Sequence, residues 1–156
     1  MRKRIIAAQQ GTEPPDDNWL SLEELAEVEI TSESPAHPIE AALLPGRASG
    51  WRAAEPGKQT IRLLFKEPQQ LRRIRLDFYE PHTKRTQEYV VRWSPDGGQS
   101  FRDVVRQQWH FSPRGSTVET EDHRCDLPAV KVLELSIVPD TSGGTAVASL
   151  VQFRVA

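Results

Sequence analysis

The chain has 156 residues and a formal net charge of −2, which suits one domain built around one core. So small a net charge disfavours a protein that binds polyanions through bulk charge, and we expect no nucleic-acid partner. Cys125 is the only cysteine, so the fold cannot depend on an intrachain disulfide. The short apolar run Ile5–Ala8 is below the roughly 7–15 residues of a secretory signal, and no run approaches the roughly 18 of a membrane span. We therefore expect a cytoplasmic protein; an extracytoplasmic protein whose leader has been removed is the alternative.

Charge is unevenly distributed along the chain. Every formally charged residue from Glu13 to Glu40 is acidic, whereas the centre is rich in arginine and lysine. One interpretation is that the central cations lie on solvated strand faces and pair across strands. The other is a basic face for an anionic partner.

The N-terminal part of the chain predicts little regular structure. Residues 1–18 contain glycine, two prolines and an acidic pair, which indicates an arm or linker before a domain at 19–156. Ser21 and Glu24 fit a capping box, so we expect a helical turn at 22–26 followed by a strand through Ile30. A long connection with a helical turn at 39–44 and a loop at 47–57 follow.

The rest of the chain alternates apolar and polar residues with a period of two, which is typical of half-buried antiparallel strands. We expect a strand at 60–65 ended by Pro68, then two long strands joined as a hairpin by the polar loop 80–86. The turn Ser94–Gly98 has proline, aspartate and glycine where a tight turn needs them. Further strands are predicted from Phe101, at 117–127 before a break at Pro128, at 132–138, and at the C-terminus with Val151, Phe153 and Val155 inward. This pattern predicts an all-β sandwich or barrel with one or two helical turns.

Five segments, in order, resemble the discoidin or coagulation factor V/VIII C-type family: ITSESPAHPIEAALLPGRASGWRAAEPGKQTIRLLF, LRRIRLDFYE, TQEYVVRWSPDGGQSFRDV, VLELSIVPD and ASLVQFRVA. The resemblance covers about Val28 to Ala156, and the Ser-x-Asp-Gly turn is its most specific part. It implies a galactose-binding-like jelly roll of two antiparallel sheets packed face to face. Members of the family are mostly non-catalytic modules that bind ligands with loops at one end. The turn Leu44–Arg47 lacks the carboxylate that often accompanies a structural calcium in that family, so we expect no metal or other cofactor.

Candidate ligand-binding residues are basic or aromatic side chains in and near the loops. A sugar site needs hydrogen-bond donors and an aromatic ring against which the C–H face of a pyranose packs. The candidates are Arg47, Trp51, Arg52, His82, Lys84, Arg85 and Trp109. The alternative is a solvated loop with the tryptophans in the core.

No arrangement of nucleophile, base and acid has a spacing that predicts an enzyme. Asp122, His123 and Cys125 are close in sequence but fit no common zinc pattern. The sequence therefore favours a non-catalytic module that binds carbohydrate through loops at one end of the sandwich. A cytoplasmic protein-interaction or assembly domain is the alternative, and the sequence does not set the oligomeric state.

Overall fold

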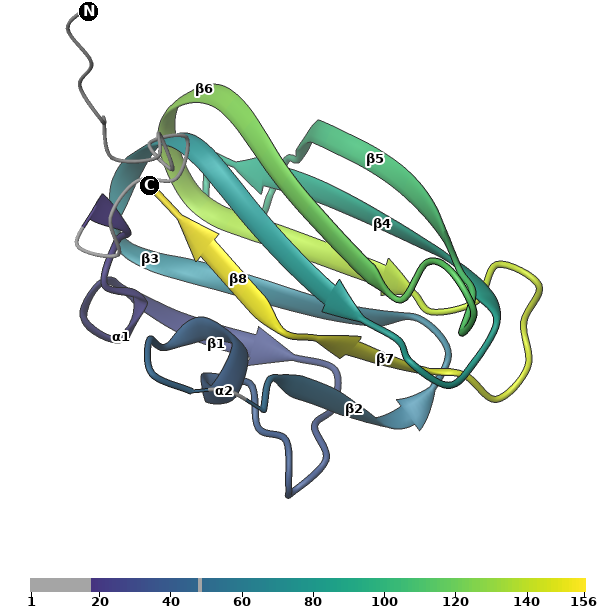
Figure 1. Ribbon diagram of the computed structural model, residues 1–156. Coiled ribbons are helices and arrows are strands. Elements are labelled where there is room, and N and C mark those ends of the chain that lie inside the picture. The colour runs from purple at the N-terminus through teal and green to yellow at the C-terminus, as the bar shows by residue number, and fades with distance from the viewer. Residues whose placement is uncertain (1–17, 48) are drawn as a thin grey trace, which may run out of the picture.

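The computed structural model describes residues 18–47 and 49–156, which form a β-sandwich with two single-turn helices (Figure 1). The predicted arm at 1–18 lies outside the described residues apart from Asn18. Every pair of hydrogen-bonded strands is antiparallel. The elements are α1 (Leu22–Leu25), β1 (Ala26–Ile30), α2 (Glu40–Leu43), β2 (Trp51–Pro56), β3 (Gln59–Tyr79), β4 (Arg85–Ser94), β5 (Arg102–Phe111), β6 (Val118–Val138), β7 (Val147–Leu150) and β8 (Gln152–Val155).

Strands β3 and β6 bend sharply and contribute to both layers of the sandwich. Each is 21 residues long, and in Figure 1 both turn back at the same end of the molecule. The bend coincides with shifts of their pairing register between Leu64 and Arg73. Pro68 and Pro128 lie at the bend, where proline's missing N–H is tolerated. The prediction that these prolines end strands is therefore wrong, because they bend continuous strands instead.

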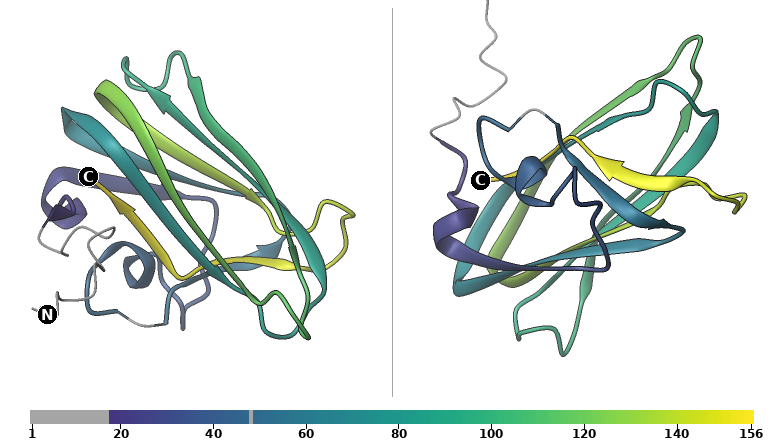
Figure 2. Two further views of the ribbon diagram at one scale, coloured as in Figure 1. Left: turned by 45° about the horizontal axis from the view of Figure 1, so that its top comes forward. Right: turned by 90° about the horizontal axis from the view of Figure 1, so that it is seen from below.

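The two layers differ in size. The larger sheet has the order β1-β3-β6-β4-β5 and uses the first half of β3 and the second half of β6. In the smaller sheet the second half of β3 lies between the first half of β6 and β8. A separate two-stranded sheet, β2-β7, closes one side, as the rotated views show (Figure 2). The predicted β-sandwich is confirmed.

The predicted hairpin of β3 with β4 is wrong. These strands are not hydrogen-bonded neighbours, since β4 pairs with β5 and β6. They belong to opposite layers, and the rings of Phe78 and Tyr89 stack across the core with centroids 5.5 Å apart. Period-two alternation shows which face of a strand is buried but does not identify its partner. The connection between these strands therefore crosses from one sheet to the other.

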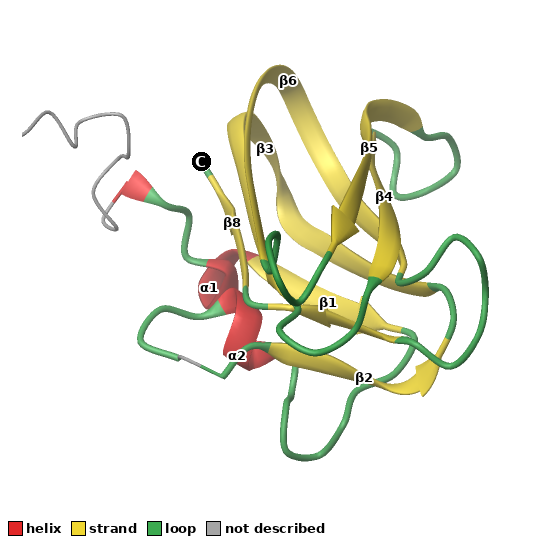
Figure 3. Ribbon diagram, turned by 45° about the vertical axis from the view of Figure 1, so that its right-hand side comes forward, coloured by secondary structure: helices red, strands yellow, loops and turns green. Residues whose placement is uncertain are grey.

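Three smaller expectations also need correction. The predicted loop at 47–57 contains β2, which pairs with β7. Val151 was expected to face inward but is exposed, because it forms the kink between β7 and β8. The capping box is not formed, since the Ser21 side chain makes no cap hydrogen bond. Its backbone oxygen instead accepts from the N–H groups of Glu24 and Leu25. Both helical turns are present, side by side near β8 (Figure 3).

The outer face of the larger sheet carries a row of alternating charges across all five strands, which we call the charge ladder: Glu29, Arg62, Glu134, Arg92 and Asp103. The central Glu134 is buried and accepts from Arg62 Nε at 2.8 Å and from Arg92 Nε at 2.9 Å. Cross-strand pairs of opposite charge stabilise a sheet. The ladder supports the interpretation that central cations pair with acids on strand faces. Within the described part of the chain, no helix has the length and apolar character needed to cross a membrane.

Candidate functional site

A hollow of about 310 Å³, which we call the loop hollow, lies where four segments of the chain meet. These are the β1–α2 connection, the start of β2, the β3–β4 connection and the junction between β7 and β8. The volume falls at the lower end of the range typical of small-molecule sites. The lining residues are His37, Ser49, Trp51, Arg52, Tyr79, Glu80, Pro81, His82, Thr83, Ser149, Leu150 and Val151.

Gly50 brings the start of β2 close to the β7–β8 junction at the base of the loop hollow. Its φ of +67° is one that residues with a side chain rarely adopt. A Cβ at this position would lie 2.6 Å from Leu150 O and 2.9 Å from Val151 Cα. Both contacts are with backbone, so no side-chain rotation relieves them. The shape of this part of the hollow therefore depends on glycine.

Trp51 forms the inner wall of the loop hollow. Its side chain is only 1% exposed, and its Nε1 donates to Ser32 O at 3.1 Å. The ring belongs to the hydrophobic core, as the packing alternative predicted. It therefore does not present an open face on which a sugar ring stacks.

Tyr79 provides the exposed aromatic ring of the loop hollow. It is the last residue of β3, lies on the outer face of the smaller sheet and is 52% exposed. It pairs across the strands with Val118, which is 53% exposed. Tyr79 was not among the residues predicted to bind a ligand, although its position after Arg75 and Asp77 in the outward register of β3 places it at the edge of the loops.

The β3–β4 connection is held by a partly buried ion pair. Glu80 accepts from Arg85 Nε at 2.8 Å and from the backbone N–H groups of His82 and Thr83 at 3.2 and 3.3 Å. Arg85 is 3% exposed and also donates to Pro139 O at 2.7 Å. Burial alone would raise the pKa of Glu80, but the hydrogen bonds from Arg85 and the loop amides hold that pKa below its ordinary value. Arg85, predicted as a ligand donor, therefore supports the loop from beneath.

Two of the predicted donors do reach the loop hollow. Arg52 is exposed on β2, and its backbone N–H donates to His37 O at 3.1 Å. His82 is exposed in the β3–β4 connection. His37 also lines the hollow, although it was not among the candidate residues. Together with Tyr79, these side chains provide an aromatic face surrounded by hydrogen-bonding groups.

The remaining predicted residues lie elsewhere. Lys84 is exposed in the same connection but does not line the loop hollow. Trp109 is half-buried on β5 and packs against the core. Arg47 lines a second hollow of about 460 Å³ between α1, α2 and β8, which we call the helix hollow. These placements leave the ligand-binding roles of the seven residues as predictions.

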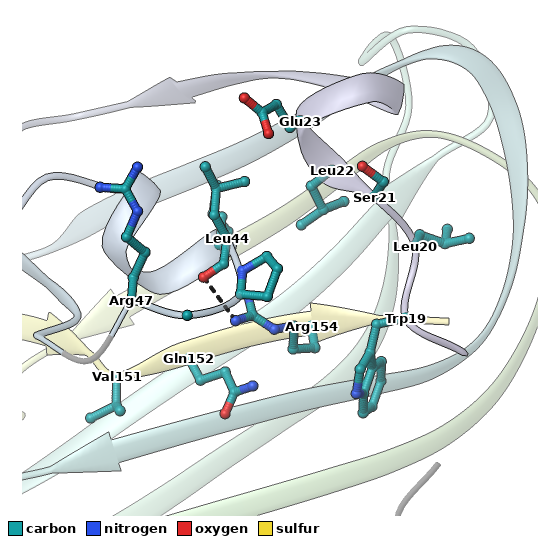
Figure 4. Close-up of a pocket in the computed structure, with 13 residues that line it drawn as sticks. Trp19, Leu20, Ser21, Leu22, Glu23, Leu44, Arg47, Val151, Gln152 and Arg154 are labelled. Atoms are coloured by element: carbon teal, nitrogen blue, oxygen red, sulfur yellow. Dashed lines mark hydrogen bonds between the residues drawn. The ribbon is translucent and has the colours of Figure 1, made fainter. Parts of the chain in front are cut away.

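The helix hollow combines apolar walls with polar groups (Figure 4). Trp19 lies at one side, and the guanidinium of Arg73 lies 4.7 Å from the centre of its ring. Arg154 is buried and donates to Ala42 O at 3.1 Å and to Leu44 O at 3.0 Å, which ties β8 to the end of α2. The hollow is therefore shaped by one arginine that links two elements.

The described residues contain no group of three or more metal-ligating side chains suited to a metal ion. The three residues that are close in sequence, at positions 122, 123 and 125, each contact another part of the fold. Asp122 pairs with Arg73, and His123 Nε2 lies 2.6 Å from Tyr89 Oη. Cys125 Sγ lies 3.6 Å from Leu71 O.

A buried carboxyl group, that of Glu119, lies away from both hollows on the first half of β6, next to the half-buried Glu121. Glu119 accepts from Gln87 Nε2 at 3.3 Å and faces Glu121. Burial, followed by the interaction with Glu121, raises the pKa of Glu119 to about 8. Its position among core strands indicates a structural role.

No family model and no curated protein sequence matches the chain. Several solved structures, by contrast, are similar to the chain. The family 32 carbohydrate-binding module of Clostridium perfringens NanJ, in complex with galactose, has a TM-score of 0.62 at 15% identity and covers 88% of this chain and 96% of its own. The fold is the galactose-binding-like jelly roll.

Two further structures share the fold. The family 32 module of AlyQ, in complex with 4,5-unsaturated mannuronic acid, has a TM-score of 0.63 at 12% identity, covering 85% of this chain and 95% of that one. A pectin-binding carbohydrate-binding module has a TM-score of 0.61 at 13% identity, covering 85% and 90%. At these identities the likeness concerns the fold, and function must be argued from the site.

Proposed function

We propose that the protein is a non-catalytic carbohydrate-binding module and that the loop hollow is its site. The observation that carries this proposal is the exposed ring of Tyr79 at the edge of a hollow whose rim also includes Arg52, His37 and His82. A pyranose has an apolar C–H face and a rim of hydroxyl groups, so it needs this combination of a ring and surrounding donors. Solved structures with this fold bind galactose, an unsaturated mannuronic acid or pectin, which supports the proposal.

A kinship with the discoidin family is part of the same proposal. Its support is the turn Ser94–Gly98, the most specific element of the resemblance. Asp96 accepts from the backbone N–H groups of Gln99 and Ser100, each at 3.0 Å, and Gly97 and Gly98 have positive φ. The turn therefore has the conformation that its aspartate and glycines predict.

A glycan array that includes neutral and acidic sugars, followed by calorimetric titration of the best ligand, tests the proposed function. Tyr79→Ala should weaken binding on the order of tenfold, because the loss of a stacking ring removes about 1.4 kcal/mol. Tyr79→Phe keeps the ring and should bind nearly as well as the wild type. An array and titration in which no sugar binds would refute the proposal, as would an alanine variant with unchanged affinity.

A protein-interaction role is the second candidate, and one observation favours it. Of the four large exposed apolar side chains among the residues that the structure describes, three lie together at one end of the smaller sheet: Tyr79, Val118 and Val151. Exposed apolar clusters often mark protein interfaces. Co-purification from the native host at low and high salt distinguishes carbohydrate binding from protein interaction. A protein partner that no longer co-purifies with the Val118→Asp variant, but still does so with the Arg52→Ala variant, would favour the interaction domain.

A further inference from the structure

We propose that the loop hollow and the helix hollow are two halves of one trough that binds a stretch of an acidic polysaccharide chain. This inference rests on the proposed carbohydrate-binding function and extends it, because it assigns the class of sugar and the length of the ligand. It predicts contact with several consecutive sugars along the β7–β8 segment, beyond those held in the loop hollow.

Continuity of the chain joins the two hollows. Val151 lines both of them. From it, the floor continues through residues 149 and 150 into the loop hollow and through residues 152 and 154 into the helix hollow. At about 3.3 Å per residue, this segment is at most roughly 17 Å long, with the kink at Val151 near its middle. The segment 43–47 borders the helix hollow and residues 49, 51 and 52 border the loop hollow, so one stretch of chain also forms a side of each.

An aromatic residue lies at each end of the trough. Tyr79 lines the loop hollow, and Trp19 lines the helix hollow, where the guanidinium of Arg73 holds its ring. Arg73 and Tyr79 are six residues apart on β3, which corresponds to roughly 20 Å along a strand. One or two sugars do not span this distance, whereas a chain of several sugars contacts both rings.

The charges of the trough favour a ligand that carries carboxylates. Arg47 in the helix hollow and Arg52 in the loop hollow are both exposed, and neither forms an ion pair with any residue that the structure describes. Of the two acids that line the trough, Glu80 is neutralised by Arg85, which leaves Glu23 on the helix side. One available guanidinium in each half matches a polymer with a carboxylate on successive sugars.

Calorimetric titration with galacturonate and mannuronate oligomers of one, two, four and six sugars tests the inference. Affinity for one acidic series should rise on the order of tenfold from two to six sugars. Neutral galactose oligomers of equal length should bind on the order of tenfold more weakly than that series. Trp19→Ala and Arg47→Ala should remove most of the gain with length while leaving the affinity for the two-sugar ligand unchanged. Arg102→Ala, on the opposite edge strand β5, is the charge control and should match the wild type.

The outcomes separate this inference from the proposed function. If sugars bind but six bind no more tightly than two, or if Arg47→Ala behaves as the wild type with six sugars, the trough is overturned and the loop hollow remains the site. Equal affinity for neutral and acidic oligomers also overturns it. If no sugar binds at all, the proposed function itself fails. Because Arg47 lies in an exposed turn, its variant keeps the test valid even if Trp19→Ala proves unstable.

Discussion

Replacing Gly50 with alanine tests whether close backbone packing shapes the floor of the candidate site. Alanine at a positive φ costs about 1–2 kcal/mol, of which about 0.4–1 kcal/mol is offset by the reduced freedom of the unfolded chain. At Gly50 the new Cβ also meets Leu150 O at 2.6 Å, so the backbone must shift. Overpacking of this kind costs about 1–3 kcal/mol. We expect Gly50→Ala to lose about 2–3 kcal/mol of stability in total.

Gly57 supplies a matched control for this substitution. Its φ is +88°, but a Cβ there meets no atom within 4 Å, so Gly57→Ala isolates the cost of backbone conformation. That cost should be about 1 kcal/mol or less once the unfolded chain is considered.

Thermal unfolding measures the difference between the two glycine variants. For a domain of this size, 1 kcal/mol corresponds to about 2–4 °C, so Gly50→Ala should lower Tm by roughly 5–10 °C and Gly57→Ala by no more than about 4 °C. Sugar affinity should fall only in the Gly50 variant. Equal losses of Tm in both variants would refute the reasoning, because the close approach to Leu150 would then have no consequence.

Two further predictions concern buried carboxylates. Glu134→Gln removes the charge that accepts from Arg62 and Arg92, whose side chains are 44% and 38% exposed. The loss in the free energy of unfolding should lie between the values for an exposed and a buried ion pair, at about 2 kcal/mol, as measured by urea denaturation. A loss below about 0.5 kcal/mol would contradict a stabilising charge ladder. Glu119 has a pKa near 4.5 when unfolded and about 8 when folded, so the folded state binds an extra proton between these values and stability falls as pH rises through that window. Glu119→Gln should flatten the decline of Tm between about pH 5 and pH 8, and an unchanged slope would show that Glu119 is not its cause.

The buried faces of most strands are predictable from the sequence, because period-two alternation depends only on which side of a strand faces the core. Leu133, Leu135 and Ile137 alternate with polar residues and valine in the strand predicted at 132–138, and all three are fully buried. Strand partners were not predictable in the same way. The predicted pairing of β3 with β4 was wrong because Phe78 and Tyr89 face the core equally well from the same sheet or from opposite sheets.

The candidate site was predictable in outline only. Alternation on β4, followed back from Tyr89 through Gln87, places Arg85 on the inner face, and its burial follows from that pattern. The same rule places Tyr79 outward at the last position of β3. The burial of Trp51, by contrast, depends on the pairing of β2 with β7, a contact between segments about 100 residues apart that no local pattern reveals.

The anchoring of the β3–β4 connection has a consequence for how a ligand associates. The backbone around His82 is fixed by Glu80, and Glu80 is fixed by an arginine that is itself bonded to Pro139 O. A site of this kind loses little conformational freedom when a ligand arrives, because its loop is already ordered. Binding should therefore proceed by docking into a formed surface with little backbone movement, and differences in affinity among sugars should appear mainly in their rates of dissociation.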